Sequence, residues 1–276
     1  MTTVEEQVAQ HYTHGALGEA IHRGLESLGR SADDFRDTDL AGMDEFHMGG
    51  REATAALAEK LDLKPAMSLL DIGCGIGGAA RYFARTFGCH ATGIDLTPEY
   101  VETARTLTKQ LGLAEKVEFR VGSALDLPFA DASFDAATLL HVGMNIPDKR
   151  RLASQVHRVL KQGATFGVFD AMRTGPGPIA YPVPWAARES TSFVESPAEY
   201  REVLQAAGFV VVSERNQRQM ALDFFARIRS RMAASGPPPL GLHILMGQDA
   251  PLKIANLVTM LEQGTIAPIE IIAKRH

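Results

Sequence analysis

Short apolar runs alternate with segments of helical periodicity along most of the chain. The apolar runs, typical of buried strands, cover residues 68–72, 91–95, 117–122, 134–141, 163–170, 209–215 and 266–274. Apolar residues at helical spacing follow from residue 79 and over 98–111, 149–161, 196–207, 219–234 and 252–262. Alternation of this kind predicts a parallel sheet with right-handed crossovers. We therefore expect an α/β fold, a doubly wound seven-stranded mostly parallel sheet whose last strand is antiparallel.

Further segments surround the predicted sheet. Helical spacing over residues 4–29 and 52–61 predicts helices before the first strand, and these helices cannot form a core of their own. We expect an N-terminal helical cap over residues 1–56 and a sheet domain over 57–276. Two long stretches interrupt that domain at 172–196 and 219–262, and insertions of this length in a compact domain are usually functional.

The chain is organised around the turn after the first apolar run. Gly73, Gly75 and Gly78 have the spacing of the dinucleotide-binding fingerprint, and Asp95 follows about twenty residues later, as that fingerprint requires. A nicotinamide-dependent oxidoreductase is therefore one interpretation. Asp71 favours another, because an acid two residues before the first glycine would repel a pyrophosphate and attract an ammonium group.

From about Leu57 to Arg275 the chain resembles the class I S-adenosylmethionine (SAM) dependent methyltransferases, and among them the sarcosine/dimethylglycine-like and ubiquinone/menaquinone-type enzymes. The resemblance is carried by the segments LDIGCGIG at 70–77, GIDL at 93–96, GSALDLPF at 122–129 and SFD at 133–135. It implies the Rossmann-like methyltransferase fold, SAM as cofactor and S-adenosylhomocysteine (SAH) as its product.

The resemblance also implies cofactor-binding residues. They are Tyr12, Asp71, Gly73, Gly75, Asp95, Leu96, Ser123, Ala124, Leu125 and His141. Asp95 corresponds to the acid that binds the ribose, and Leu96 to the residue that packs on adenine. Many relatives carry an acid at the position of Ser123, so a carboxylate contact to the adenine amino group does not carry over. For Tyr12, closure over the cofactor and packing on a helix surface are equally open.

Three residues are candidates for catalysis. His141 and Asn145 follow the fourth strand, at the sheet edge where the reacting centre lies, and His47 belongs to a His-x-Gly segment similar to those above the methyl group in small-molecule methyltransferases. A histidine here could act as a general base or orient the acceptor. The alternative for His47 is that it only satisfies backbone groups in the cap. The resemblance places acceptor lids in the two insertions, where Trp185 could line the acceptor pocket or anchor its loop.

Composition and charge limit the other function classes. The net charge of −5 is mixed along the sequence and forms no extended basic surface, so we expect no nucleic-acid partner. Two cysteines without metal-type spacing suit a reducing compartment and predict no metal site. No apolar run approaches the length of a membrane span, and the first residues are polar. We expect a cytoplasmic monomer or homodimer that does not bind a membrane.

These observations predict methyl transfer from SAM to a small-molecule acceptor. An amine is slightly favoured over an oxygen or carbon acceptor, because a neutral amine needs no base, whereas a phenol or a carbon acid would require His47 or His141. The alternatives are an NAD-dependent oxidoreductase and a non-catalytic SAM-binding protein. The two long insertions favour an enzyme over a binding module, since a module has no need of acceptor lids.

Overall fold

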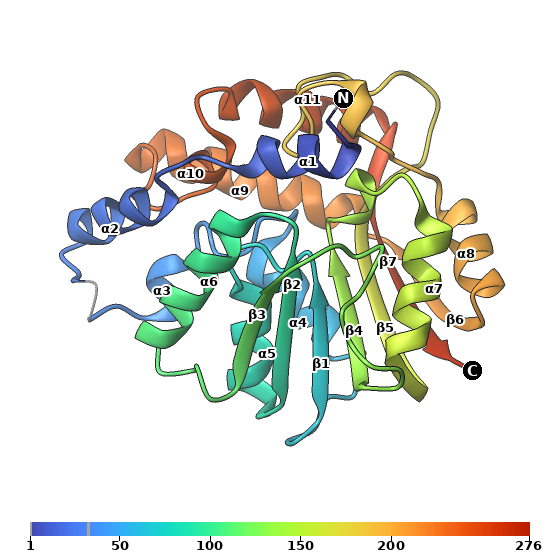
Figure 1. Cartoon of the computed structure of the whole chain (residues 1–276). Coiled ribbons are helices and arrows are strands. Elements are labelled where there is room, and N and C mark those ends of the chain that lie inside the picture. Colours follow the sequence, from blue (N-terminus) through green and yellow to red (C-terminus); the bar gives the residue numbers. More distant parts are fainter. Residues whose placement is uncertain (1, 32–33) are drawn as a thin grey trace.

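A seven-stranded sheet runs through the centre of the computed structural model, which describes residues 2–31 and 34–276 (Figure 1). Its strands are β1 (Ser68–Ile72), β2 (His90–Asp95), β3 (Val117–Val121), β4 (Phe134–Leu140), β5 (Leu160–Arg173), β6 (Phe209–Asn216) and β7 (Ile266–Arg275). The order across the sheet is β3-β2-β1-β4-β5-β7-β6. The strand β7 is antiparallel to both of its neighbours, and the pairs from β3 to β5 are parallel. This confirms the predicted mostly parallel sheet with an antiparallel last strand.

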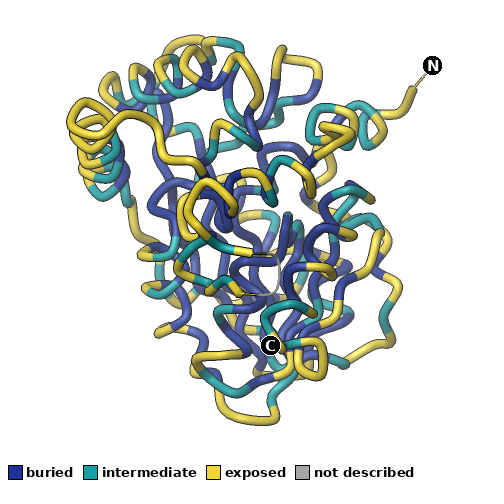
Figure 2. The backbone as a smooth tube through the Cα atoms, turned by 90° about the vertical axis from the view of Figure 1, so that its left-hand side faces the viewer, coloured by how far each residue is buried: buried dark blue, intermediate teal, exposed yellow. Residues whose placement is uncertain are grey.

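Helices cover both faces of the sheet. On one face α4 (Gly50–Ala58), α5 (Gly78–Phe87) and α6 (Pro98–Gln110) pack against apolar strand residues such as Leu69, and on the other face α7 (Lys149–Val159) and α8 (Pro197–Ala206) pack around Leu70. Alternate residues of one strand thus enter two separate cores. Because both faces of the central strands are buried, β1 and β4 are largely apolar, which is why their runs were visible in the sequence, whereas the edge strands β3 and β6 carry exposed charges such as Glu118 and Glu214. Figure 2 shows the buried backbone gathered in the middle of the molecule.

Most of the remaining elements lie beyond one end of the sheet (Figure 1). They are the helices α1 (Val4–Tyr12), α2 (Leu17–Ser27), α9 (Arg218–Ser235), α10 (His243–Met246) and α11 (Ala250–Gln263), with the 3₁₀ turns η1 (Gly143–Asn145) and η2 (Glu189–Thr191). The helix α3 (Asp37–Leu40) instead lies at the level of the strands, where Asp37 pairs with Arg85 of α5. The N-terminal and C-terminal parts share a core here, since Leu17, Ile21 and Leu25 of α2 pack with Leu240 and Leu245. The two segments therefore stabilise one another.

Several boundaries differ from the sequence expectation. The strand β5 begins at Leu160 and ends at Arg173, longer than the predicted 163–170, because Leu160 pairs with Phe134 and Arg173 pairs with Ile266. The helix before it ends at Val159 instead of residue 161. The helix α4 crosses the boundary at residue 56 and packs on the sheet. The division into cap and sheet domain stays a prediction. In the described ranges, no helix is both long and apolar enough to cross a membrane.

Candidate active site

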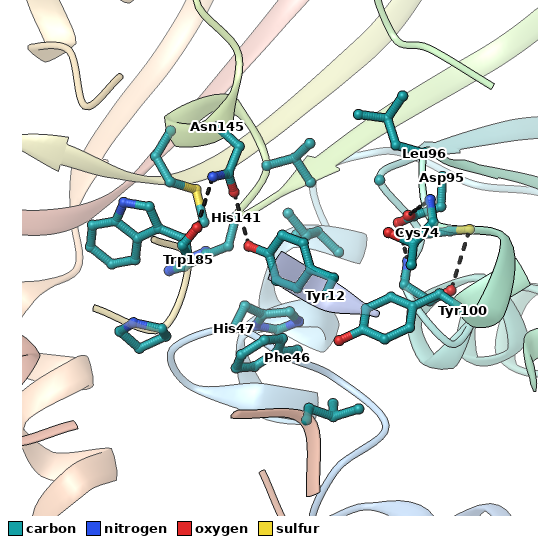
Figure 3. Close-up of a pocket in the computed structure, with 18 of the residues that line it drawn as sticks. Tyr12, Phe46, His47, Cys74, Asp95, Leu96, Tyr100, His141, Asn145 and Trp185 are labelled. Carbon is teal, nitrogen blue, oxygen red and sulfur yellow. Dashed lines mark hydrogen bonds between the residues drawn. The ribbon is translucent and has the colours of Figure 1, made fainter. Parts of the chain in front are cut away.

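A pocket lies over the carboxyl ends of β1, β2 and β4, where parallel sheets place ligand sites (Figure 3). One half is formed by the glycine turn and the ends of β2 and β3, and we call it the cofactor half. The other half is formed by the loop after β4, the two insertions and the segment around His47, and we call it the acceptor half. Figure 3 shows Tyr12 between the two sets of residues. Its hydroxyl donates to Asn145 Oδ1 at 2.9 Å, and its ring lies 5.8 Å from that of Tyr100.

The glycine turn gives the cofactor half its shape. Gly73 and Gly75 have φ angles of 69° and 54°, which residues with a Cβ atom rarely adopt. A Cβ on Gly73 would meet Val142 Cγ2 at 2.3 Å, whereas a Cβ on Gly75 would find no protein atom nearer than Tyr100 Cδ2 at 4.0 Å. Gly73 therefore permits close packing of the turn on the loop after β4, and Gly75 keeps space in the pocket open.

Asp71 contributes a buried carboxylate to this half. Its Oδ1 accepts from Thr138 Oγ1 at 2.8 Å, and its Oδ2 is buried with no hydrogen-bond partner within the described residues. Burial raises the pKa of Asp71 to about 7. A buried carboxylate oxygen without a donor is costly, so this position is suited to a cationic donor from a ligand.

Asp95 connects the end of β2 to the glycine turn. Its Oδ2 accepts from Gly75 N at 2.9 Å and its Oδ1 from Thr97 N at 2.8 Å, and it lines the pocket beside Leu96. Burial raises the pKa of this carboxyl, and the two backbone donors partly offset that rise. Each oxygen keeps a lone pair for a ligand hydroxyl.

The Asp95→Ala variant is expected to bind SAM more weakly by about 1–3 kcal/mol, because the ribose hydroxyls would lose their acceptor and the Gly75 amide would lose its hydrogen bond. Calorimetric titration with SAM measures the loss, and a thermal melt confirms that the variant is folded. The Asp126→Ala variant is a suitable control, since Asp126 is not among the lining residues of the pocket. Equal SAM affinity in the Asp95 variant and the wild type would refute the ribose assignment.

The end of β3 completes the cofactor half in a way that the sequence did not reveal. Ala124 and Leu125 line the pocket as expected, but Ser123 does not. The Ser123 hydroxyl accepts from Leu125 N at 2.9 Å and donates to Glu5, and it is Glu5 of α1 that lines the pocket. Glu5 was missed because an acid in the first turn of a helix ordinarily has a local explanation.

The acceptor half is mainly apolar. The apolar residues that line it come from the N-terminal segment, the loop after β4 and the insertions, and include Phe46, Met48, Met144, Trp185, Phe224, Phe225, Ile254 and Leu257. Trp185 has both of the roles left open above, since it lines the pocket and donates from Nε1 to Ser192 Oγ at 2.9 Å within its own loop. The sequence predicted a helix and an acceptor lid here, without identifying Phe224 and Phe225 as the residues of α9 that line the pocket.

Of the two candidate histidines, His141 is the one with a free acceptor atom. Its backbone φ is 55°, and its Nδ1 lies 3.1 Å from Phe169 O. Because a carbonyl oxygen can only accept, Nδ1 carries the proton and Nε2 is left as an acceptor. That Nε2 is buried and has no partner among the described residues, and the residue lines the pocket. Burial, and next the nearby His47, lower the pKa of His141 to about 3. The imidazole is therefore neutral at ordinary pH and a weak base.

His47 lies in the pocket wall, but its nitrogens are directed into the protein. Its Nε2 lies 3.2 Å from Glu45 Oε2 and 3.0 Å from Thr54 Oγ1, and its Nδ1 lies 3.4 Å from Met48 O. Glu45 also pairs with Arg51. The His47 and His141 rings are 5.8 Å apart. His47 is thus held in a buried polar network, and its open role as a base stays a prediction.

Asn145 is engaged by the protein on both ends of its amide. Its Nδ2 donates to Trp185 O and to Thr191 O, both at 2.9 Å, and its Oδ1 accepts from Tyr12. One side chain therefore connects the loop after β4, the 172–196 insertion and α1. This arrangement brings Asn145 to the pocket as predicted, but as a junction between segments that cover it.

Comparison with known proteins relates this chain to methyltransferases. A family model described as a methyltransferase domain matches residues 70–168. A probable tocopherol O-methyltransferase of Oryza sativa subsp. japonica is 38% identical over 149 residues, which cover 53% of this chain and 40% of that protein. A glycine/sarcosine/dimethylglycine N-methyltransferase of Actinopolyspora halophila is 32% identical over 207 residues, 74% of this chain and 34% of that protein. The chain thus spans about two fifths or less of the length of these two relatives.

A solved structure extends the likeness in fold to the whole chain. The geranyl diphosphate C-methyltransferase of Streptomyces coelicolor A3(2), in complex with Mg²⁺, geranyl diphosphate and SAH, superposes with a TM-score of 0.71 at 19% identity, covering 100% of this chain and 98% of that one. The matched domain over residues 70–168 and the shared fold agree with the resemblance to the class I SAM-dependent methyltransferases that the segments around Gly73 and Asp95 carry.

Proposed function

We propose that this protein transfers a methyl group from SAM to a small-molecule acceptor. The observation that carries the proposal is the pocket with two unlike halves. One half has a buried carboxylate, Asp71, and a half-buried one, Asp95, around an open glycine turn, and the other is an apolar chamber in which a single imidazole nitrogen is available. These halves meet at the ends of β1 and β4, the place where a cofactor and an acceptor must come together.

The residues of the cofactor half fit SAM. The partnerless Asp71 Oδ2 would hold the ammonium group, the lone pairs of Asp95 the ribose hydroxyls, and Leu96 with Ala124 and Leu125 the adenine ring. The space kept open at Gly75 lets the backbone pass close to the ligand. Bound SAM supplies an electrophilic methyl group on a sulfonium. The protein's task is then to orient the acceptor in line with that group and to exclude water.

The lining of the pocket favours an acceptor without an anionic group. Among the described residues that line it, none is Lys or Arg, and the charged ones are Glu5, Asp44, Glu45, Asp71 and Asp95. A phosphate or carboxylate entering this pocket would lose its hydration without gaining a cationic partner. We propose a largely apolar, uncharged acceptor that packs against Trp185 and Phe224.

An amine nitrogen is the acceptor atom that the site favours. His141 Nε2 can accept a hydrogen bond from an N–H, but with its pKa lowered to about 3 it is a poor base for a phenol or a carbon acid. Desolvation in an apolar chamber favours the neutral form of an amine, which is the nucleophile. The curated relatives include O-, C- and N-methyltransferases by name, so the choice rests on this chemistry.

We further propose that the protein works in the cytoplasm, as a monomer or homodimer, without a nucleic-acid or membrane partner. The mixed charge of the sequence supports this part of the proposal.

Binding and transfer assays test the proposal together. Calorimetry should show binding of SAM and SAH and none of NAD. A panel of apolar amines, phenols and phosphorylated analogues, assayed with SAM carrying an isotopically labelled methyl group, should show label in the amines. Binding of NAD instead of SAM would return the oxidoreductase interpretation, and SAM binding without transfer to any acceptor would indicate a binding module.

The affinity for SAM is expected to fall as the pH is lowered through about 7. The Asp71 carboxyl has a pKa of about 7 in the free protein, and an ammonium group beside it would lower that pKa in the complex. Below pH 7 the free protein must lose a proton to bind, so the affinity falls by up to about tenfold per pH unit, whereas above pH 7 it is constant. Titrations between pH 5.5 and 8.5 measure the slope.

The Asp71→Asn variant removes the titrating group and serves as the control. It should bind SAM weakly at every pH, with a flat profile over this range. A wild-type profile as flat as that of the variant would contradict the ammonium assignment.

A further inference from the structure

Glu5 of α1 contributes a carboxylate to the wall of the cofactor half. This carboxylate accepts a hydrogen bond from the hydroxyl of Ser123, which lies 118 residues later in the sequence. Glu5 is half-buried, and no hydrogen bond to its second carboxylate oxygen is found within residues 2–31 and 34–276. The helix that carries it is fixed at both ends. Thr3 and Glu6 form a capping box at its start, and His11 Nε2 lies 3.0 Å from Pro184 O near its end.

The order of the strands places the base of the cofactor next to Glu5. Asp71 lies on β1 and Asp95 on β2, and β3 is on the far side of β2 from β1. A ligand whose amino-acid end is at β1 and whose ribose is at β2 must extend its base toward the end of β3. There the pocket is lined by Gly122, Ala124 and Leu125, and Glu5 joins this lining through its contact with Ser123.

The chemistry of that wall suits one edge of adenine. The side chains of Ala124 and Leu125 can only pack, so an amino group on the base must find its acceptor elsewhere. Glu5 has a carboxylate with one oxygen directed to Ser123 and the other available. A charge-assisted hydrogen bond from an amino group to a carboxylate is among the stronger polar contacts in proteins.

We propose that Glu5 accepts a hydrogen bond from the exocyclic amino group of the adenine ring, so that the N-terminal helix distinguishes adenine from a base with a carbonyl at that position. This inference rests on the proposed use of SAM. Ser123 is a positioning residue in it, because its hydroxyl holds the Glu5 carboxylate. The same contact couples α1 to the cofactor, and through Tyr12 and Asn145 to the acceptor half.

The test compares two ligands on two proteins by calorimetry. The ligands are SAH and S-inosylhomocysteine, in which a carbonyl replaces the adenine amino group. Glu5→Gln should weaken SAH binding roughly tenfold. It should leave S-inosylhomocysteine binding unchanged or tighter, because the amide of glutamine can donate to the carbonyl. The control is Glu6→Gln, which removes the same charge from the neighbouring residue, a helix-cap residue that does not line the pocket.

The possible results distinguish a failure of the Glu5 inference from a failure of the proposed function. If the wild type binds SAH but Glu5→Gln changes the affinity for both ligands by the same factor, Glu5 only anchors α1 and the inference is wrong, while the proposed function stands. Ser123→Ala then gives the same equal loss. If the wild type binds neither ligand, the proposed function and the inference fail together.

Discussion

Replacing Gly75 with valine is expected to lower the affinity for SAM by about 100-fold or more while the protein stays folded. The Cβ position at Gly75 is clear of protein atoms to 4.0 Å, so a β-carbon there has no close protein neighbour and the side chain extends into space that the ligand needs. The φ of 54° adds strain of about 1–2 kcal/mol, which lowers the melting temperature without unfolding the chain. Calorimetry with SAM and a thermal melt give the two quantities.

Gly112→Val is the matched control for this variant. Gly112 has a φ of 70° and nothing within 4 Å of its Cβ position, and it does not line the pocket. It therefore introduces the same backbone strain away from the site and should leave SAM binding intact. A Gly75 variant with normal SAM affinity would place the ligand elsewhere in the molecule.

Replacing His141 with phenylalanine is expected to reduce kcat by about 100-fold while SAH binds with nearly unchanged affinity. Phenylalanine keeps the shape of the ring and removes Nε2, the atom proposed to orient the acceptor. The rate of the wild type should be independent of pH from about 5 to 8 as far as His141 is concerned, because its pKa is lowered to about 3. Steady-state kinetics over this range measure both.

A histidine that acts as a base would instead give the pH profile a limb near an ordinary histidine pKa. Such a limb in the wild type, absent in the His141→Phe variant, would show that His141 acts as a base on an acidic acceptor. Near-normal kcat in the variant would instead assign the ring to packing. The His141→Asn variant, whose side chain also tolerates a positive φ, separates loss of the nitrogen from backbone strain.

The sheet was predictable because its signals are local. A strand buried on both faces is apolar along its whole length, and a glycine turn followed by a helix marks the ligand edge, so 68–72 and its turn could be identified directly. The helices α3 and α10 were missed because each has four residues, too few for a periodic pattern. The place of β7 between β5 and β6 depends on pairing that the sequence pattern does not encode.

The site residues were predictable where they lie at the end of a strand or in the turn that follows it. Asp71, Gly75 and Asp95 line the pocket as expected, since strand ends converge at one sheet edge. The position of Glu5 could not be foreseen, because it depends on how α1 packs over the sheet. The sequence also could not show that Nε2 of His141 is available while both ring nitrogens of His47 have partners. That difference depends on neighbours distant in sequence, such as Phe169, whose carbonyl oxygen lies beside His141 Nδ1.

The position of β7 constrains the order in which the chain can mature. Because β6 pairs only with β7, and β7 comes last in the sequence, β6 has no partner in the sheet while residues 266–275 are still within the ribosome. The strands β1 to β5 with α5, α6 and α7 can assemble earlier during synthesis, while β6 still lacks its partner. Once residues 266–275 have emerged, β7 pairs with β6 and packs against α9 and α11, which line the pocket, so ligand binding should be gained only after β7 has joined the sheet.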